Sequence, residues 1–133
     1  MAALDTNVLV RLLVDDDAAQ CAAVARLVRK ASSRGEALFV PITVSLESEW
    51  VLRHRYGYDR GRVTRALSDL LSTTELSFEA ESALELALLL SGRTQADFSD
   101  CLHLALAVRA GERPLWTFDK AAAKLPDARL LPA

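Results

Sequence analysis

Two aspartates that directly follow apolar runs have the clearest potential for chemistry in this sequence. Asp5 closes the first apolar run and is followed by Thr6 and Asn7, and Asp119 closes a late apolar run. In open α/β sheets, ligands bind at the carboxyl ends of the strands, so both acids are where an active site is expected. Each also precedes a predicted helix, where aspartate is a common N-cap, and position alone leaves that alternative open.

Two glutamates on one predicted helix must point in different directions. Glu47 and Glu49 are two positions apart, which is about 200° around a helix, so only one faces inward. Glu49 precedes Arg53 by four positions, the favourable order for a surface ion pair. Glu47 shares an apolar stripe with Val44, Trp50 and Val51, where an unpaired carboxylate costs several kcal/mol. We therefore expect Glu47 to face inward and to have a partner such as a metal ion.

A nearly all-apolar helix begins with two aspartates one turn apart. Residues 101–108 (CLHLALAV) are apolar on most faces, which is typical of a buried helix. Asp97 and Asp100 share a face at its start, and Asp97 is explained as the N-cap. Asp100 lies inside the first turn, where the helix dipole favours an anion by only a few tenths to about 1 kcal/mol. That gain is too small to explain a buried acid.

These acids together suggest a metal site. Carboxylates brought close to one another raise each other's pKa unless a cation neutralises them, and ligands that are all oxygen select Mg²⁺ or Mn²⁺ over Zn²⁺. Such ions promote phosphodiester hydrolysis by polarising the phosphate, lowering the pKa of the attacking water and stabilising the leaving oxygen. The expected catalytic acids are Asp5, Glu47, Asp100 and Asp119.

Apolar spacing predicts the alternating helices and strands that must position these acids. Strands are expected at residues 2–4, 37–42, 75–78, 115–118 and 129–131, and helices at 8–14, 19–28, 43–56, 60–71, 79–90, 98–110 and 120–125, with Thr43 and Asp59 as N-caps. Long helices between strands imply right-handed crossovers and a sheet covered on both faces. We expect an α/β fold of three α/β/α layers with a central, mostly parallel sheet, in which residues 1–133 form one domain.

Composition is that of an ordinary globular protein, with 51% hydrophobic and 26% charged residues. Cys21 and Cys101 lie in predicted helices without metal-binding spacing, so neither a disulfide framework nor structural zinc is expected, and the cytoplasm suits both thiols. Residues 1–4 include no basic region or long apolar stretch, so neither a signal peptide nor a membrane anchor is expected.

Four blocks resemble the PIN-domain family, and in particular the VapC-type toxin ribonucleases of bacterial toxin-antitoxin pairs. They are LDTNVLVRLL at 4–13, SLESEWVLRHRYG at 45–57, ADFSDCLHLALAVRAG at 96–111 and LWTFDKAAAKL at 115–125. The resemblance implies a PIN-like fold and a Mg²⁺- or Mn²⁺-dependent endoribonuclease with Asp5 and Asp100 as metal ligands. It also implies that Glu47 and Asp119 are the other two acids of the site. The residues that would orient the ligands or the water are Thr6, Asn7, Asp97 and Thr117.

The resemblance also implies partners: an RNA substrate, a small antitoxin protein and a second copy of the chain. With 18 acidic and 16 basic residues, nucleic acid must bind through a local patch instead of net positive charge. Arginines cluster around the turn that ends the Glu47 helix, with His54 and Tyr56 among them: Arg53, Arg55, Arg60, Arg62 and Arg65. The candidate RNA contacts are Arg53, Arg55 and Arg60. A solvated helix end explains the same cluster equally well.

Other functions fit the sequence less well. A phosphatase with an aspartate nucleophile normally needs a second acid where Asn7 stands, and a receiver domain needs paired acids after the first strand. His54 and His103 lack an activated nucleophile such as a GxSxG elbow. The alternative from another class is a PIN-like module that binds RNA or protein with little catalysis.

Overall fold

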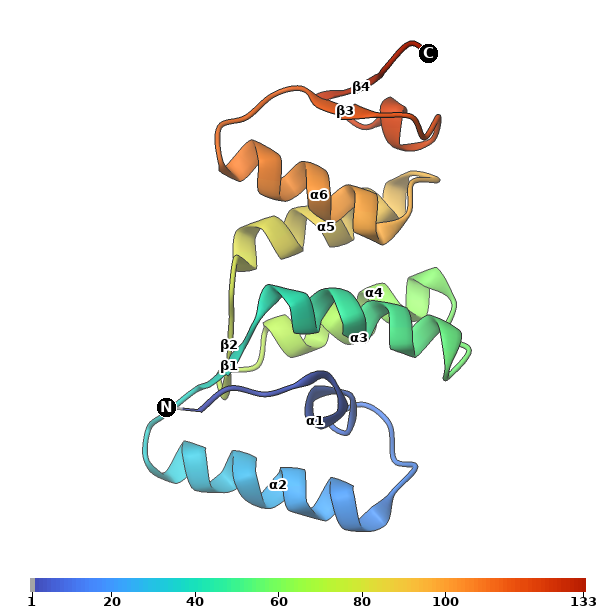
Figure 1. Cartoon of the computed structure of the whole chain (residues 1–133). Coiled ribbons are helices and arrows are strands. Elements are labelled where there is room, and N and C mark those ends of the chain that lie inside the picture. Colours follow the sequence, from blue (N-terminus) through green and yellow to red (C-terminus); the bar gives the residue numbers. More distant parts are fainter. Residues whose placement is uncertain (1) are drawn as a thin grey trace. The chain divides into compact units, whose positions relative to one another are not determined.

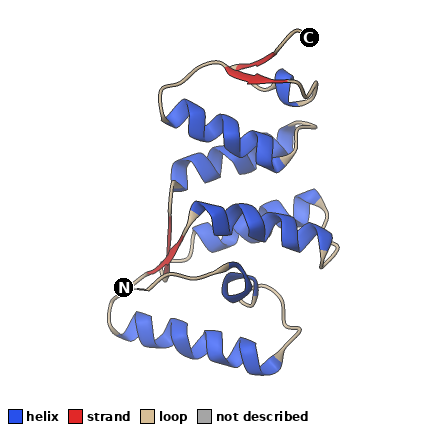
Figure 2. Cartoon of the chain, viewed as in Figure 1, coloured by secondary structure: helices blue, strands red, loops and turns tan. Residues whose placement is uncertain are grey.

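The computed structural model describes residues 2–133. Residue 1, the first residue of the predicted domain and of the N-terminal segment, lies outside the described residues. One compact unit extends to Glu79 and a second begins at Ala80, and each is described by itself (Figures 1 and 2). The first contains α1 (Thr6–Val10), α2 (Ala18–Ser33), β1 (Leu38–Val40), α3 (Ile42–His54), α4 (Arg60–Leu71) and β2 (Leu76–Phe78). The second contains α5 (Glu81–Arg93), α6 (Phe98–Arg109), β3 (Leu115–Thr117), the 3₁₀ helix η1 (Ala122–Lys124) and β4 (Ala128–Leu130).

A short parallel sheet delivers Asp5 in the first unit. β1 pairs with β2, with Leu38 opposite Leu76, and alternate residues are buried as the strand period of two requires. The predicted first strand is present as a parallel bridge between Ala3 and Phe39, and the amide of Leu4 donates to the carbonyl of Phe39 at 2.9 Å. The chain therefore leaves this sheet immediately before Asp5.

The helices of the first unit begin at residues that satisfy their free amide groups. Asp59 caps α4 as predicted, accepting from the amide of Arg62 at 2.8 Å. Thr43 was the wrong cap for α3, because that helix already begins at Ile42 and Pro41 is in the N-cap position. The partner of the Ile42 amide is the carboxylate of Glu79, which accepts from it at 2.8 Å.

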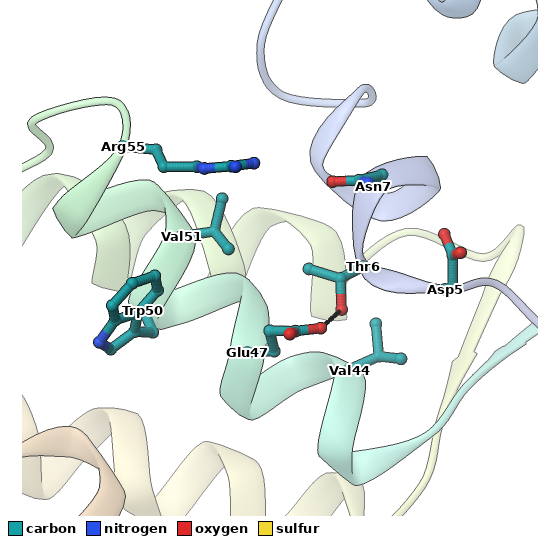
Figure 3. Close-up of a pocket in the computed structure, with 8 residues that line it drawn as sticks. All are labelled: Asp5, Thr6, Asn7, Val44, Glu47, Trp50, Val51 and Arg55. Atoms are coloured by element: carbon teal, nitrogen blue, oxygen red, sulfur yellow. Dashed lines mark hydrogen bonds between the residues drawn. The ribbon is translucent and has the colours of Figure 1, made fainter.

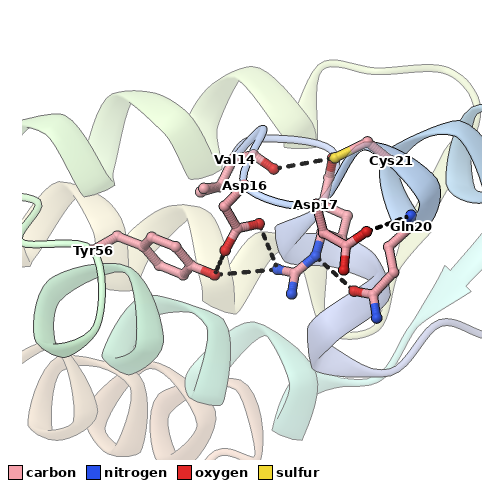
Figure 4. Close-up of polar contacts among 7 residues, drawn as sticks. Val14, Asp16, Asp17, Gln20, Cys21 and Tyr56 are labelled. Atoms are coloured by element: carbon pink, nitrogen blue, oxygen red, sulfur yellow. Dashed lines mark hydrogen bonds and ion pairs between the residues drawn. The ribbon is translucent and has the colours of Figure 1, made fainter.

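A polar cluster fastens α1 to neighbouring segments of the first unit. Arg11, at the end of α1, donates through Nη1 to Tyr56 Oη at 3.2 Å and through Nε to Gln20 Oε1 at 2.9 Å. Tyr56, two residues after α3, donates to Asp16 Oδ2 at 2.6 Å, and Figure 4 shows Asp16 beside the Tyr56 hydroxyl and Gln20 on the other side of the cluster. These bonds hold α1 between the end of α3 and the start of α2.

In the second unit, α5 and α6 contact each other, and their buried residues include Leu84, Leu88, Leu102 and Leu104. β3 and β4 are parallel, with Leu115 opposite Ala128. Asp119 follows β3, and η1 follows Asp119. The strand-acid-helix order predicted from the sequence is confirmed here.

The predicted α/β class and the parallel strand pairing are confirmed. Among the described residues, the strands form two sheets of two strands each, β1-β2 and β3-β4, one in each unit. Within residues 2–133, the helices are too short or too polar to cross a bilayer.

Candidate functional site

Asp5 serves both as the first acid after the sheet and as the N-cap of α1. Its backbone is extended, and Oδ1 accepts from the amide of Val8 at 3.2 Å. The two roles considered for Asp5 are therefore compatible, because the cap employs one oxygen and fixes the direction of the other. The residue is exposed, so this carboxylate is accessible to a ligand.

Thr6 joins α1 to α3 at the second acid. Its hydroxyl donates to Oε1 of Glu47 in a hydrogen bond drawn in Figure 3. Thr6 is only 8% exposed, so its side chain has little freedom and Glu47 has a fixed partner. The contact between α1 and α3 thus brings Glu47 to the same side of the first unit as Asp5.

Asp5 and Glu47 line one open pocket of about 480 Å³, within the size range of small-molecule sites. Its lining residues all belong to the first unit: Asp5, Thr6, Asn7, Val44, Glu47, Trp50, Val51 and Arg55. Figure 3 shows Arg55 extending from the far end of α3 toward Asn7. The pocket therefore combines two carboxylates, an amide, a guanidinium and an indole.

The sequence predicted the wrong glutamate of α3 to be buried. The ion pair between Glu49 and Arg53 is confirmed, with Arg53 Nη2 donating to Oε1 at 3.0 Å, but Glu49 is only 4% exposed and Glu47 is exposed at the pocket. The reason is that α3 buries two stripes. Val44 and Val51 form the one that includes Glu47, and the residues of the other, spaced as i, i+3, i+4 and i+7, are Ser45, Ser48, Glu49 and Leu52.

The second unit contains three of the predicted acids. Asp100 is half-buried in the first turn of α6, and its pKa is raised, first by burial and then by the negative charges of Asp119 and Asp97. His103, one turn further along α6, lowers the same pKa. The negative charges of the neighbouring acids disfavour ionisation of Asp100. A cation bound beside these carboxylates would offset that repulsion.

Asp119 is held in place at both its backbone and its side chain. Its amide donates to Oγ1 of Thr117 at 3.0 Å, and its Oδ1 accepts from the amide of Ala122 at 2.8 Å. Thr117 therefore shapes the turn that carries Asp119, and its orienting role in a reaction stays a prediction. Asp97 is the N-cap residue of α6, but its side chain makes no capping hydrogen bond.

The donor set fits a hard divalent cation, because every candidate ligand is a carboxylate oxygen. Asp5 and Glu47 belong to the first unit, and Asp97, Asp100 and Asp119 belong to the second. In residues 2–133, no three or more His, Cys, Asp or Glu side chains are grouped so that they could hold a metal. Binding of one ion by acids of both units stays a prediction.

The arginines of the predicted RNA patch have different surroundings. Arg53 donates to the buried Glu49, and Arg62 lies over the ring of Tyr58 with its Cζ 3.8 Å from the centroid. Arg60 lies at the start of α4 and is absent from the pocket lining. Arg55 lines the pocket beside the acids, so it is the arginine best placed to contact a ligand there.

Two residues near the acids were not included among the candidate site residues from the sequence. Trp50 is in the pocket although its spacing from Glu47 suggested only a core residue, and it is 52% exposed. His103 is exposed and acts on the pKa of Asp100. The spacing of three positions, from Glu47 to Trp50 and from Asp100 to His103, was the signal that both share a helix face with an acid.

Comparison with known proteins finds a family model and a curated relative that each match most of the chain. The family model described as "PIN domain" matches residues 2–128. A curated protein named VapC ribonuclease, from Aquifex aeolicus (strain VF5), is 27% identical over 125 residues, which cover 94% of this chain and 92% of that protein.

Proposed function

We propose, from the premise that the chain belongs to the PIN-domain family, that it is a metal-dependent endoribonuclease that hydrolyses RNA phosphodiester bonds. PIN and VapC proteins are generally metal-dependent nucleases. The observation that carries the proposal is the pocket in which Asp5 and the Thr6-bonded Glu47 are both accessible. Similarity to a VapC ribonuclease along nearly the whole chain supports RNA as the substrate.

The proposed metal is Mg²⁺ or Mn²⁺, with Asp5 and Asp100 as its ligands. When bound, it would polarise the phosphate and lower the pKa of the attacking water. Glu47, whose Oε1 is fixed by Thr6, would orient that water, and Asp119, whose Oδ1 is fixed by the η1 amide, would complete the acidic site. Asn7, Asp97 and Thr117 would orient these groups.

We also propose a small antitoxin partner and a homodimer, as the resemblance to VapC-type toxins implies. The proposed compartment is the cytoplasm, where RNA is available and where the free thiols of Cys21 and Cys101 would remain reduced. Size-exclusion chromatography with light scattering tests the dimer. Affinity capture of the tagged chain from its native cells, with identification of a small co-purifying protein, tests the antitoxin.

The test of the proposed activity incubates the purified chain, freed of co-purifying partners, with a pool of structured RNAs. Parallel reactions contain Mg²⁺, Mn²⁺ or EDTA, and an Asp100→Asn variant purified identically controls for contaminating nucleases. Cleavage that requires metal and Asp100 supports the proposal. Equal cleavage by wild type and variant, or intact RNA throughout, contradicts it for this pool and favours a PIN-like module that only binds RNA or protein.

A further inference from the structure

Trp50 is a large apolar side chain at the edge of an otherwise polar pocket. It follows Glu47 by three positions on α3 and lines the same pocket as Asp5 and Glu47. With 52% of its surface exposed, it differs from Val51 beside it, which is only 8% exposed. Burial therefore does not explain a tryptophan at this position, and a role in contacting a ligand is the alternative.

His54 supports the Trp50 ring from one side. The two rings are stacked, with centroids 4.5 Å apart and planes inclined by 30°. His54 follows Trp50 by four positions on α3, so the helix itself sets this geometry. A stacked neighbour reduces the freedom of the indole, while about half of the residue's surface stays exposed.

A cation and an amide line the same pocket as Trp50. Arg55 lines the same pocket and extends toward Asn7 (Figure 3). A guanidinium binds phosphate oxygens through paired donors, and an indole stacks on any base because every base has a π face. The pocket thus offers a partner for a base and a partner for a phosphate next to the carboxylates.

We propose that Trp50, supported by His54, is a stacking surface for a nucleobase of the RNA, with Arg55 contacting a phosphate of the same strand. The inference rests on the proposed function and adds a contact to it, between Trp50 and an unpaired nucleotide of the RNA. A base inside a duplex has both faces covered by its neighbours, so only an unpaired base can stack on a side chain. Stacking does not select one base, so the site favours single-stranded RNA without strong base preference.

Tryptophan fluorescence provides a test that does not depend on cleavage, because the chain has two tryptophans. Trp116→Phe leaves Trp50 as the reporter, and Trp50→Phe leaves Trp116, which is similarly exposed at 53%, as the matched control. Both are made in the Asp100→Asn background to keep the RNA intact and are titrated with a six-nucleotide single-stranded RNA and with a duplex of the same sequence, in Mg²⁺. We expect the single strand to quench Trp50 and not Trp116, and the duplex to quench Trp50 much less.

Binding of labelled RNA, followed by fluorescence anisotropy, measures the contribution of the ring. Trp50→Ala is expected to weaken binding of the single strand about tenfold, and Trp50→Phe much less, because base-aromatic stacking supplies about that much affinity per base. Trp116→Ala is expected to bind like the parent protein. Circular dichroism melting checks that each variant is folded.

The inference is overturned if Trp50 is not quenched, or if Trp50→Ala binds the single strand as tightly as Trp116→Ala does. That result would instead favour a protein partner, and not RNA, as the ligand of Trp50. Cleavage by the chain with its native Asp100 is measured separately. Cleavage without stacking on Trp50 rejects the inference and retains the proposed function. Stacking without cleavage retains the Trp50 contact with RNA and rejects the proposed nuclease activity.

Discussion

The hydroxyl of Thr6 is the direct partner of a candidate catalytic acid. It donates to Oε1 of Glu47 from a nearly buried position. Thr6→Val keeps the shape and removes the donor, so Glu47 is no longer held in one orientation. We expect RNA cleavage to fall by roughly tenfold or more, since changes in the residues that orient catalytic carboxylates typically cost 10- to 100-fold. Cleavage rates at saturating Mg²⁺ measure this.

Thr6→Ser is the matched control for that experiment because it retains the hydroxyl and loses only a methyl group. Most of the activity should return in this variant. Equal activity of the valine variant and the wild type would mean that the hydrogen bond does not position Glu47 for the reaction.

Asp100 should make the stability of the metal-free protein depend on pH. Burial and the charges of Asp119 and Asp97 raise its folded-state pKa above the ordinary value of 3.8. The folded state therefore holds more protons than the unfolded state from about that value upward, and stability falls as pH rises through the raised pKa. At pH 7 in EDTA, Asp100→Asn should raise the Tm, on the order of 1 °C because the group is partly exposed.

Thermal unfolding of both proteins between pH 4 and pH 7 checks this sign. The advantage of the asparagine variant should shrink as pH is lowered toward 3.8. A variant less stable than the wild type at pH 7 would show that the ionised Asp100 is stabilising without metal.

The sequence placed Asp5 and Asp119 correctly because acids that directly follow strands and precede helices have few possible positions. It failed for Glu49 because one apolar stripe was assumed for α3, whereas the helix buries two. The polar residues Ser45 and Ser48 conceal the second stripe. Burial of small polar residues depends on what packs against the helix, and hydrophobic periodicity does not record it.

The start of α3 depends on a distant acid. Pro41 has no side chain that can cap, and the amide of Ile42 is bonded by Glu79, which follows β2. Glu79→Ala removes this cap and should lower the free energy of unfolding by about 1 kcal/mol, the usual cost of losing an N-cap. Urea unfolding followed by circular dichroism measures the loss.

Glu85→Ala provides the comparison, because Glu85 is exposed on α5 and the acid in the first turn of α5, Glu81, is unchanged. This variant should unfold within about 0.5 kcal/mol of the wild type. Equal effects of the two substitutions would mean that the Glu79 bond adds nothing beyond an ordinary surface charge.

The predicted helices and strands were largely right because apolar periodicity and caps act within a few residues of the chain. Asp59 shows this, since its side chain bonds an amide only three positions away. The Glu79 cap of α3 was missed because its partners are 37 positions apart. Contacts between residues far apart in the sequence depend on which strands pair. The sequence indicates the fold class but not these pairs.

Across the whole chain, the proposed acids are divided, with Asp5 in the unit that extends to Glu79 and Asp100 in the unit that begins at Ala80. The prediction from sequence concerned a single domain of 1–133, and local patterns cannot say how two such units act together. If one metal ion employs both acids, its binding energy requires both carboxylates at once. The thermodynamic coupling between the two residues therefore reports on the shared ion.

Mn²⁺ at about 100 times its Kd should stabilise the wild-type chain by about 2.7 kcal/mol, seen as a rise in Tm relative to EDTA. Asp5→Asn and Asp100→Asn should each lose most of that rise, and the double variant should lose no more than either single one, because the first substitution already removes the ion. Additive, partial losses would instead assign the two acids to separate, weaker sites. Retention of the full rise in either single variant would remove that residue from the ligand set.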